Sequence, residues 1–229
     1  MKFMCQTINN RVVHDFVFQL SESVDYLNWW NKKDDFATIR YCEINDEMPK
    51  GFTPVGTVEF VEKYLKLHYN KTIKPINVPE SLMLLKFTQR RIFNGTEKDI
   101  GNGENFVKSN DKIKLFSEAY CKEAPKGNYQ ISQMIDIRSE YRCFVYQQRL
   151  VGIQNYSGDF EIFPNISKIK EMIREYKNAP IAYTLDVGVN KNGTFVIEVH
   201  DFFSCGLYGF SDNRMYANML HSWFVDFVS

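Results

Sequence analysis

The sequence predicts an α+β protein that begins with a small α/β unit. Strand-like and helix-like segments alternate over residues 1–78. The middle of the chain is instead a series of short β-branched runs separated by polar turns, the pattern of antiparallel strands. Two late segments, 165–176 and 213–227, have apolar side chains at helical spacing. Because strands and helices are partly segregated along the chain, the α+β class is favoured.

The first segment contains two expected strands and two expected helices. The clearest helical face is formed by Val58, Val61 and Leu65, which lie three and then four residues apart. Two prolines in residues 74–82 indicate a boundary near residue 79. We therefore expect one domain at 1–78 and a second at 79–229. The expected elements of the first domain are strands at 2–6 and 36–44 and helices at 15–30 and 56–67.

The second segment is expected to consist mainly of antiparallel strands. A Gly/Asn-rich loop at 94–104 precedes two short strands within 105–117. A hairpin over 140–156 should turn near Gln147 and Gln148, and another should follow a helix at 165–176. The stripe of apolar side chains along the last expected helix, 213–227, is interpreted as core packing. The remaining expected elements are a strand at 128–137, paired strands at 185–189 and 194–199, and a helix at 213–227.

Two acids interrupt the last pair of strands. A three-residue loop, Lys191 to Gly193, would place Asp186 opposite Glu198, and His200 would share their face. Opposed carboxylates about 5 Å apart repel by roughly 3 kcal/mol at an effective dielectric near 20. A shared proton, a basic side chain or a metal ion could offset this repulsion. Alternatively, the hairpin lies at an edge and its acids face water, and a two-residue loop would shift the pairing.

The basic candidates lie earlier in the chain. Lys108 ends a strand-like run and Lys114 lies in the next, so both could contact phosphate, or both could belong to a solvated loop. Arg142 lies in an otherwise apolar strand and needs a partner, either an acid such as Glu140 or an anionic ligand. A nucleophilic Cys205 is disfavoured, because only His200 could act as its base.

Composition excludes several classes of protein. Lys plus Arg and Asp plus Glu each number 28, so the zero net charge does not favour nucleic-acid binding. Five cysteines without a CxxC pair are typical of reduced thiols in the cytoplasm. The N-terminus becomes polar too early for a signal peptide, and no apolar run approaches membrane-spanning length. We therefore expect a cytoplasmic protein with no membrane partner.

Taken in order, these segments resemble the ATP-grasp fold. They are most similar to its clade of small bacterial and phage proteins marked by one arginine and two lysines. The last two stretches are the most specific, because they match acid-x-Arg-x-Phe-Val and then Asp followed by Glu-x-Asn. The matching stretches are PVGTVEF (54–60), FVKSNDKIKLFS (106–117), SEYRCFV (139–145) and the segment 183–210.

The resemblance implies a fold in which two α+β subdomains hold ATP between antiparallel sheets, preceded by a pre-ATP-grasp unit at 1–78. It implies that Lys108 and Lys114 contact nucleotide phosphates, and that Arg142 neutralises the transferred phosphoryl group. The catalytic residues would thus be Arg142 and Lys114. The hinge at Gln133, Met134 and Ile135 would bind adenine, largely through backbone groups. These assignments are implied by the resemblance alone.

The same resemblance implies that Asp186 and Glu198 bind Mg²⁺ against the ATP phosphates. His200 is a departure, because the family has Asn at this position. Asn offers the hard oxygen that Mg²⁺ prefers, whereas imidazole suits transition metals, so Mn²⁺ is a possible substitute or catalysis is impaired. We expect ATP and a divalent ion as ligands, with His200 beside the metal.

The implied reaction is the ADP-forming ligation of a carboxylate to an amine, through an acyl phosphate, with small-molecule or peptide substrates. A rival interpretation is a nucleotide-binding module that has lost ligase activity and acts as a regulator or interaction partner. A metal hydrolase that uses the paired acids is less favoured, because the sequence contains no further ligand cluster.

Overall fold

The computed structural model describes residues 1–44 and 48–229, and the chain divides into two compact units. The first unit comprises Met1–Thr72, Pro180–Ala182 and Asp201–Ser229. The second comprises Ile73–Ala179 and Tyr183–His200. The C-terminal helix therefore belongs with the N-terminal segment, although residues 73–215 lie between them in the sequence. The expected domain limits at residues 78 and 79 stay a prediction, since compact units and domains of a family need not coincide.

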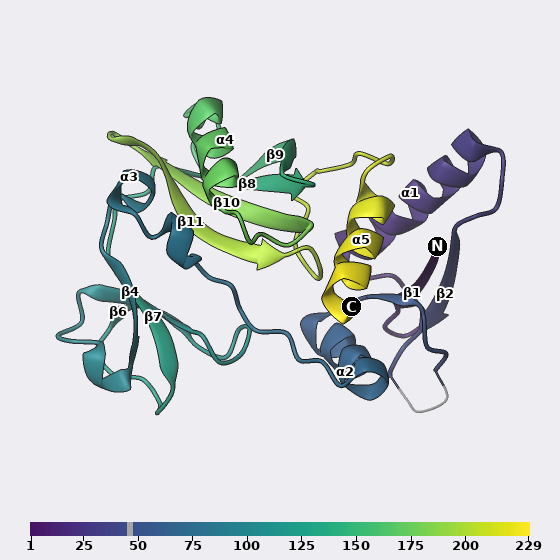
Figure 1. Cartoon of the computed structure of the whole chain (residues 1–229), viewed down its shortest axis with the longest axis horizontal. Coiled ribbons are helices and arrows are strands. Elements are labelled where there is room, and N and C mark those ends of the chain that lie inside the picture. The colour runs from purple at the N-terminus through teal and green to yellow at the C-terminus, as the bar shows by residue number, and fades with distance from the viewer. Residues whose placement is uncertain (45–47) are drawn as a thin grey trace. The chain divides into compact units, whose positions relative to one another are not determined.

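The first unit is built on a three-stranded parallel sheet in the order β2-β1-β3. Figure 1 labels β1 and β2 of this sheet. The two expected strands are present as β1 (Lys2–Gln6) and β2 (Ala37–Tyr41). The third strand, β3 (Thr53–Val55), is not predicted by the sequence, because it is short and contains Pro54. Its position at the edge of the sheet explains the proline, since an edge strand has backbone donors that need no partner strand.

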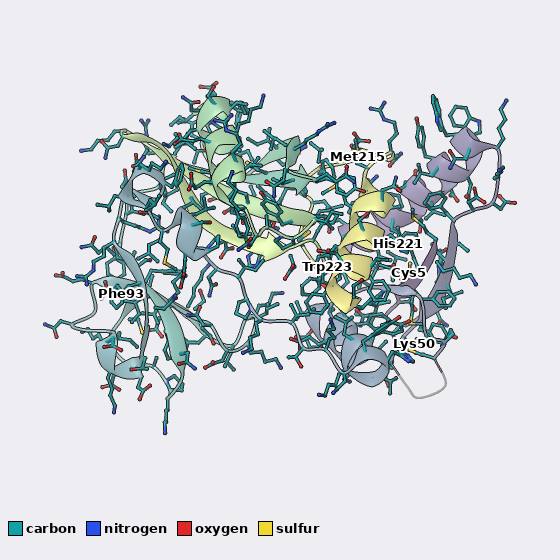
Figure 2. The ribbon with its side chains drawn as sticks, in the orientation of Figure 1. Cys5, Lys50, Phe93, Met215, His221 and Trp223 are labelled. Carbon is teal, nitrogen blue, oxygen red and sulfur yellow. The ribbon has the colours of Figure 1, made fainter. Side chains whose placement is uncertain are left out.

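Three helices pack in this unit. The two expected near the N-terminus are α1 (Asp15–Asn31) and α2 (Val58–Tyr69), and α2 begins at Thr57, whose hydroxyl accepts a hydrogen bond from the Phe60 N–H. The third, α5 (Tyr216–Val228), contacts α1 and β3. Figure 2 labels Trp223 on α5, where its side chain is buried, so the predicted core stripe of this helix is confirmed.

The second unit contains two four-stranded sheets, the first in the order β4-β7-β5-β6. Its strands are antiparallel, and Asn105–Ser109 pairs with Gln133–Tyr129. Asn94 and Gly95 suggest a loop in the sequence, yet they lie in a strand, because both pair with β7. Lys114 lies in the turn before β6 rather than on a strand, with φ of 58°. The strands are β4 (Ile92–Thr96), β5 (Asn105–Ser109), β6 (Ser117–Cys121) and β7 (Asn128–Gln133).

The second sheet has the order β11-β10-β8-β9. Gln147 and Gln148 both have positive φ, as a two-residue hairpin turn requires, so the predicted turn is confirmed. Lys191 and Asn192 separate the other two strands, and Gly193, the first residue of its strand, has φ of 104°, so the left-handed glycine expected at the third loop position is confirmed. The strands are β8 (Ser139–Tyr146), β9 (Arg149–Gly158), β10 (Ala182–Asn190) and β11 (Gly193–Asp201).

The second sheet packs against α4 (Ile166–Glu175), which begins at Asn165, whose side chain accepts from the Lys168 N–H. The apolar face of α4 is buried together with the apolar side chains of β8 and β10. A short helix, α3 (Leu85–Thr88), and 3-10 turns at Glu80–Leu82 and Glu97–Asp99 complete the unit. Within residues 1–44 and 48–229, no helix combines the length and apolar character needed to cross a membrane.

Candidate active site

The second unit brings the three expected metal ligands together. Asp186 projects from β10 and is 1% exposed, whereas Glu198 and His200 project from β11 and are partly buried. One ligand atom from each of the three lies within 4.8 Å of the others. Because β10 and β11 are neighbours in the sheet, this proximity is a direct consequence of the hairpin. The two acids therefore face each other rather than open solvent.

Basic side chains offset the repulsion between these acids. The guanidinium of Arg142, on β8, donates through Nε to Asp186 Oδ1 at 2.9 Å and through Nη2 to Oδ2 at 2.7 Å. This is the two-pronged geometry that an arginine forms best with a carboxylate. The acid that satisfies Arg142 is thus Asp186 from the neighbouring strand. Glu140 instead accepts a hydrogen bond from the Tyr156 hydroxyl at 2.8 Å.

The second acid, Glu198, forms an ion pair with a lysine of the other sheet. The ammonium of Lys108, on β5, forms an ion pair with Glu198 Oε2, and His200 Nε2 lies 2.7 Å from Glu198 Oε1. Burial lowers the pKa of Lys108 to about 8, and it outweighs the opposing effect of the Asp186 carboxylate. Lys108 is therefore close to its titration point near neutral pH, which is common for functional lysines.

A pocket of about 340 Å³ opens beside these charges. Its residues come from both sheets of the unit, so the pocket lies where the two sheets face each other. One part of its wall is apolar and another is charged, a combination suited to a ligand with a flat apolar part and an ionic part. The apolar lining side chains are Ile92, Phe106, Ala119, Met134, Ile135, Ile137 and Ile197. The polar ones are Arg90, Lys108, Gln130, Ser132, Gln133, Glu140, Tyr156 and Glu198.

The expected binding residues are placed unequally around this pocket. Lys108, Gln133, Met134 and Ile135 line it. The side-chain oxygen of Gln133 accepts from the Arg91 N–H at 3.0 Å, so this amide holds the end of β7 against the start of β4. Lys114 is exposed and is not among the described residues that line the pocket.

Arg142 and Asp186 are buried beside the pocket rather than in its wall. Among the pocket residues that sequence reasoning misses are Arg90, Phe106 and Tyr156. Phe106 has a signal in the sequence, because it lies two residues before Lys108 and so shares its strand face. Arg90 has a weaker one, an arginine directly before the apolar start of a strand. The position of Tyr156 at the pocket depends on the pairing of β8 with β9, and no local sequence pattern indicates it.

The donor set fits a divalent metal ion. Two carboxylates offer the hard oxygen ligands that Mg²⁺ and Mn²⁺ prefer, and the imidazole of His200 is acceptable to Mn²⁺. In the structure described, all four carboxylate oxygens are engaged by Arg142, Lys108 and His200. A metal ion would therefore replace these cations as the partner of the acids.

A scan against protein-family models matches residues 87–218, more than half of the chain, to the family described as ATP-grasp domain, R2K clade family 2. This match spans all the charged residues of the site. A search of curated proteins found no significant match.

Solved structures with the same fold are ligases and related proteins of low sequence identity. One is a RimK domain ATP-grasp protein from Sphaerobacter thermophilus, with TM-score 0.53 and 14% identity over 100% of this chain and 99% of that one. Another is the ATP-grasp ligase PsnB in complex with a minimal precursor, with TM-score 0.54 and 10% identity over 98% and 99%. A third is the D-alanine–D-alanine ligase of Bacillus anthracis, with TM-score 0.50 and 12% identity over 100% and 96%. At such identities the similarity establishes the fold alone.

Proposed function

Because the chain belongs to family 2 of the R2K clade of ATP-grasp domains, we propose that it is an ATP-dependent, ADP-forming carboxylate–amine ligase. The observation that carries this proposal is a pocket between two antiparallel sheets that Lys108 and Glu198 line, with the Arg142–Asp186 pair buried beside it. The expected domain organisation, a pre-ATP-grasp unit at 1–78 and an ATP-grasp domain at 79–229, is part of the proposal.

The shape of the pocket supports a specific orientation of the nucleotide. The adenine would lie against the apolar wall that includes Phe106 and Ile197. Since the Gln133 side chain is bonded to Arg91, base recognition would fall to backbone groups of Met134 and Ile135. The phosphates would then extend toward Lys108 and Glu198. Lys114 stays a proposed phosphate ligand that would reach in from the turn before β6.

Asp186 and Glu198 would hold the divalent ion, with His200 beside them. When bound, the divalent ion would supply positive charge that neutralises the negative charge developing as ADP leaves. Lys108 and Arg142, released from the two acids, would donate to the phosphate oxygens. These residues act by positioning and charge stabilisation, so the reaction needs no protein nucleophile.

The proposed chemistry has two steps. A substrate carboxylate oxygen attacks the γ-phosphorus of ATP, the bond to the β-phosphate oxygen breaks, and ADP leaves with an acyl phosphate formed. An amine then attacks the acyl carbon, phosphate leaves, and an amide or peptide bond results after the amine loses a proton. Arg142 would stabilise the phosphoryl group in both steps, because its delocalised charge can contact two oxygens at once. The substrates would be small molecules or peptides.

One observation favours a second candidate function, a nucleotide-binding regulatory or interaction module without ligase activity. His200 replaces the asparagine that the resemblance implies, and its Nε2 is bonded to Glu198. A metal ion would have to compete with that bond. Such a module would bind nucleotide but would not couple its hydrolysis to carboxylate and amine.

Release of ADP and phosphate tests the two candidates. The purified protein is mixed with ATP and Mg²⁺, or with Mn²⁺, and screened against amino acids and short peptides. The ligase predicts ADP release that depends on both an added carboxylate and an added amine. Arg142→Gln should lower turnover at least about 100-fold, as expected when charge stabilisation of a transferring group is removed.

Arg149→Gln is the matched control, because Arg149 is exposed at the start of β9 and loses the same charge. It should retain full turnover. Nucleotide binding without any substrate-dependent ADP release would favour the regulatory module instead. Equal turnover in Arg142→Gln and Arg149→Gln would remove Arg142 from the mechanism.

A further inference from the structure

Arg90 is a cation in the pocket wall that the proposed mechanism does not use. It precedes β4, and its guanidinium Nη1 donates to the backbone oxygens of Thr88 at 3.1 Å and Val196 at 3.0 Å. The guanidinium carbon also lies 5.6 Å from the centre of the Phe195 ring. These contacts hold one end of the guanidinium against β11 while the side chain lines the pocket.

The charge of Arg90 is not matched by an acid. Among residues 1–44 and 48–229, no carboxylate lies within ion-pair distance of it, and its Nε and Nη2 donors have no hydrogen-bond acceptor. Neither nitrogen is fully buried, and the side chain lines the pocket, so both nitrogens keep surface to which a ligand can bind. A partly buried cation without an anion is a strong indication of an anionic ligand.

The other two cations of the site differ in this respect. Arg142 is committed to Asp186 through two hydrogen bonds, and Lys108 is committed to Glu198. Each already has a carboxylate partner that competes with phosphate for its charge, whereas Arg90 has none in the described part of the chain. Arg90 is also close enough to Lys108 for its charge to lower the pKa of that lysine. An anion held by Arg90 would therefore lie within electrostatic reach of Lys108.

We propose that Arg90 is the first residue to bind the polyphosphate of the incoming nucleotide, and that the captured phosphates then draw Lys108 and Arg142 away from Glu198 and Asp186. The exchange would free both acids for the divalent ion, so Arg90 begins the assembly of the site. This inference rests on the proposed function for the identity of the nucleotide. The binding of polyphosphate by Arg90 is testable without it.

The test is calorimetric titration of inorganic tripolyphosphate, ATP and adenosine in EDTA, so that no metal ion contributes. We expect Arg90→Gln to weaken tripolyphosphate and ATP about 10- to 100-fold, as for the loss of charge-assisted hydrogen bonds, and to leave adenosine unchanged. Arg90→Lys should recover part of the affinity, because a single ammonium donates to phosphate but cannot keep both carbonyl contacts.

Arg91→Gln is the matched control. Arg91 is the adjacent residue, it is exposed, and its guanidinium lies over the Phe93 ring rather than in the pocket wall. Its removal should change none of the three affinities. If Arg90→Gln does not fold, the Arg90→Lys protein carries the comparison with Arg91→Lys.

Three results would overturn the inference. The first is that tripolyphosphate does not bind the unchanged protein, and the second is that it binds Arg90→Gln as tightly. The third is that the Arg90 variants weaken adenosine binding as much as ATP binding, which indicates a structural role. Failure of the proposed function has a different signature. In that case tripolyphosphate binding still depends on Arg90, but ADP release never depends on a carboxylate and an amine.

Discussion

At the scale of single residues, the site consists of charged side chains, each of which is paired with an opposite charge on another strand. Asp186 is almost fully buried, and it is tolerated there because Arg142 supplies two hydrogen bonds and the opposite charge. Lys108 gives Glu198 the same compensation from another sheet. A nucleotide with a divalent ion offers replacement partners to all four residues, so the charge balance can be kept when a ligand binds.

The protonation of Lys108 should make nucleotide affinity depend on pH. Its pKa in the folded protein is lowered to about 8, so the ammonium is half deprotonated near pH 8 and loses nearly all of its remaining charge by pH 10, while the phosphates stay ionised. We expect ATP affinity to fall in this range by up to about tenfold per pH unit, since binding must then take up a proton.

Titration of ATP at pH 7, 8, 9 and 10 in EDTA measures this effect. Lys108→Arg is the control, because an arginine stays charged across the whole range. Its affinity should be nearly constant with pH. A flat profile in the unchanged protein would show that Lys108 remains charged throughout or does not contact the phosphates.

At the scale of elements, the β10–β11 hairpin positions both acids, and its glycines matter for different reasons. Gly193 has φ of 104° at the turn, and a methyl group there would meet no atom within 4 Å. Gly188, two residues from Asp186, would instead bring its methyl group within 2.5 Å of the Phe195 ring. Phe195 is fully buried, so its ring can yield only by displacing its neighbours, and the Arg90 guanidinium carbon lies 5.6 Å from the ring centre.

We therefore expect Gly188→Ala to be the more damaging of the two substitutions. Overpacking in a buried site destabilises by about 1–3 kcal/mol, whereas backbone strain at Gly193→Ala should cost about 1 kcal/mol. Urea unfolding gives both values. Because Gly188→Ala displaces Phe195 toward Arg90, it should also weaken tripolyphosphate binding, and Gly193→Ala should not. Equal stabilities and affinities in the two variants would contradict this account of the hairpin.

At the scale of the whole molecule, the site exists because two sheets of the second unit face each other. β5 supplies Lys108, and β8, β10 and β11 supply the remaining charged residues. In the structure Arg142 neutralises Asp186 and Lys108 neutralises Glu198. Binding of the metal ion and of the nucleotide should therefore be strongly coupled, since each provides the partners that the other leaves exposed.

This coupling has a test in which removal of a cation strengthens metal binding. We expect Mg²⁺ alone to raise the unfolding temperature of the unchanged protein very little, and Mg²⁺ with a non-hydrolysable ATP analogue to raise it clearly. Arg142→Met frees Asp186, so Mg²⁺ without nucleotide should bind this variant about tenfold more tightly and stabilise it.

Lys86→Met is the matched control, because Lys86 loses the same charge from a surface ion pair with Glu171 at 3.1 Å. It should respond to Mg²⁺ as the unchanged protein does. Tight Mg²⁺ binding by the unchanged protein without nucleotide would be incompatible with acids that are neutralised by Arg142 and Lys108.

Much of the fold follows from local pattern. The helices α1, α2, α4 and α5 are predicted by apolar residues at helical spacing, and both hairpins of the second sheet by turn residues between β-branched runs. The strands β3 and β4 are missed, because Pro54, Asn94 and Gly95 are turn or breaker signals, and only pairing with a neighbour keeps those residues in strands. The local sequence predicts Lys114 on a strand, but it lies in the turn before β6, where pairing with a neighbouring strand does not hold it.

For the site, the sequence by itself determined that Asp186, Glu198 and His200 share one face of a hairpin, because side chains alternate along strands and opposed residues meet. Only the tertiary structure decided which cations face them. Arg142 and Asp186 are 44 residues apart, and Lys108 reaches Glu198 from a different sheet. Such contacts depend on how sheets are ordered and stacked, which no local periodicity encodes. The tertiary structure was likewise needed to show that the charge of Arg90 has no acidic partner among the described residues.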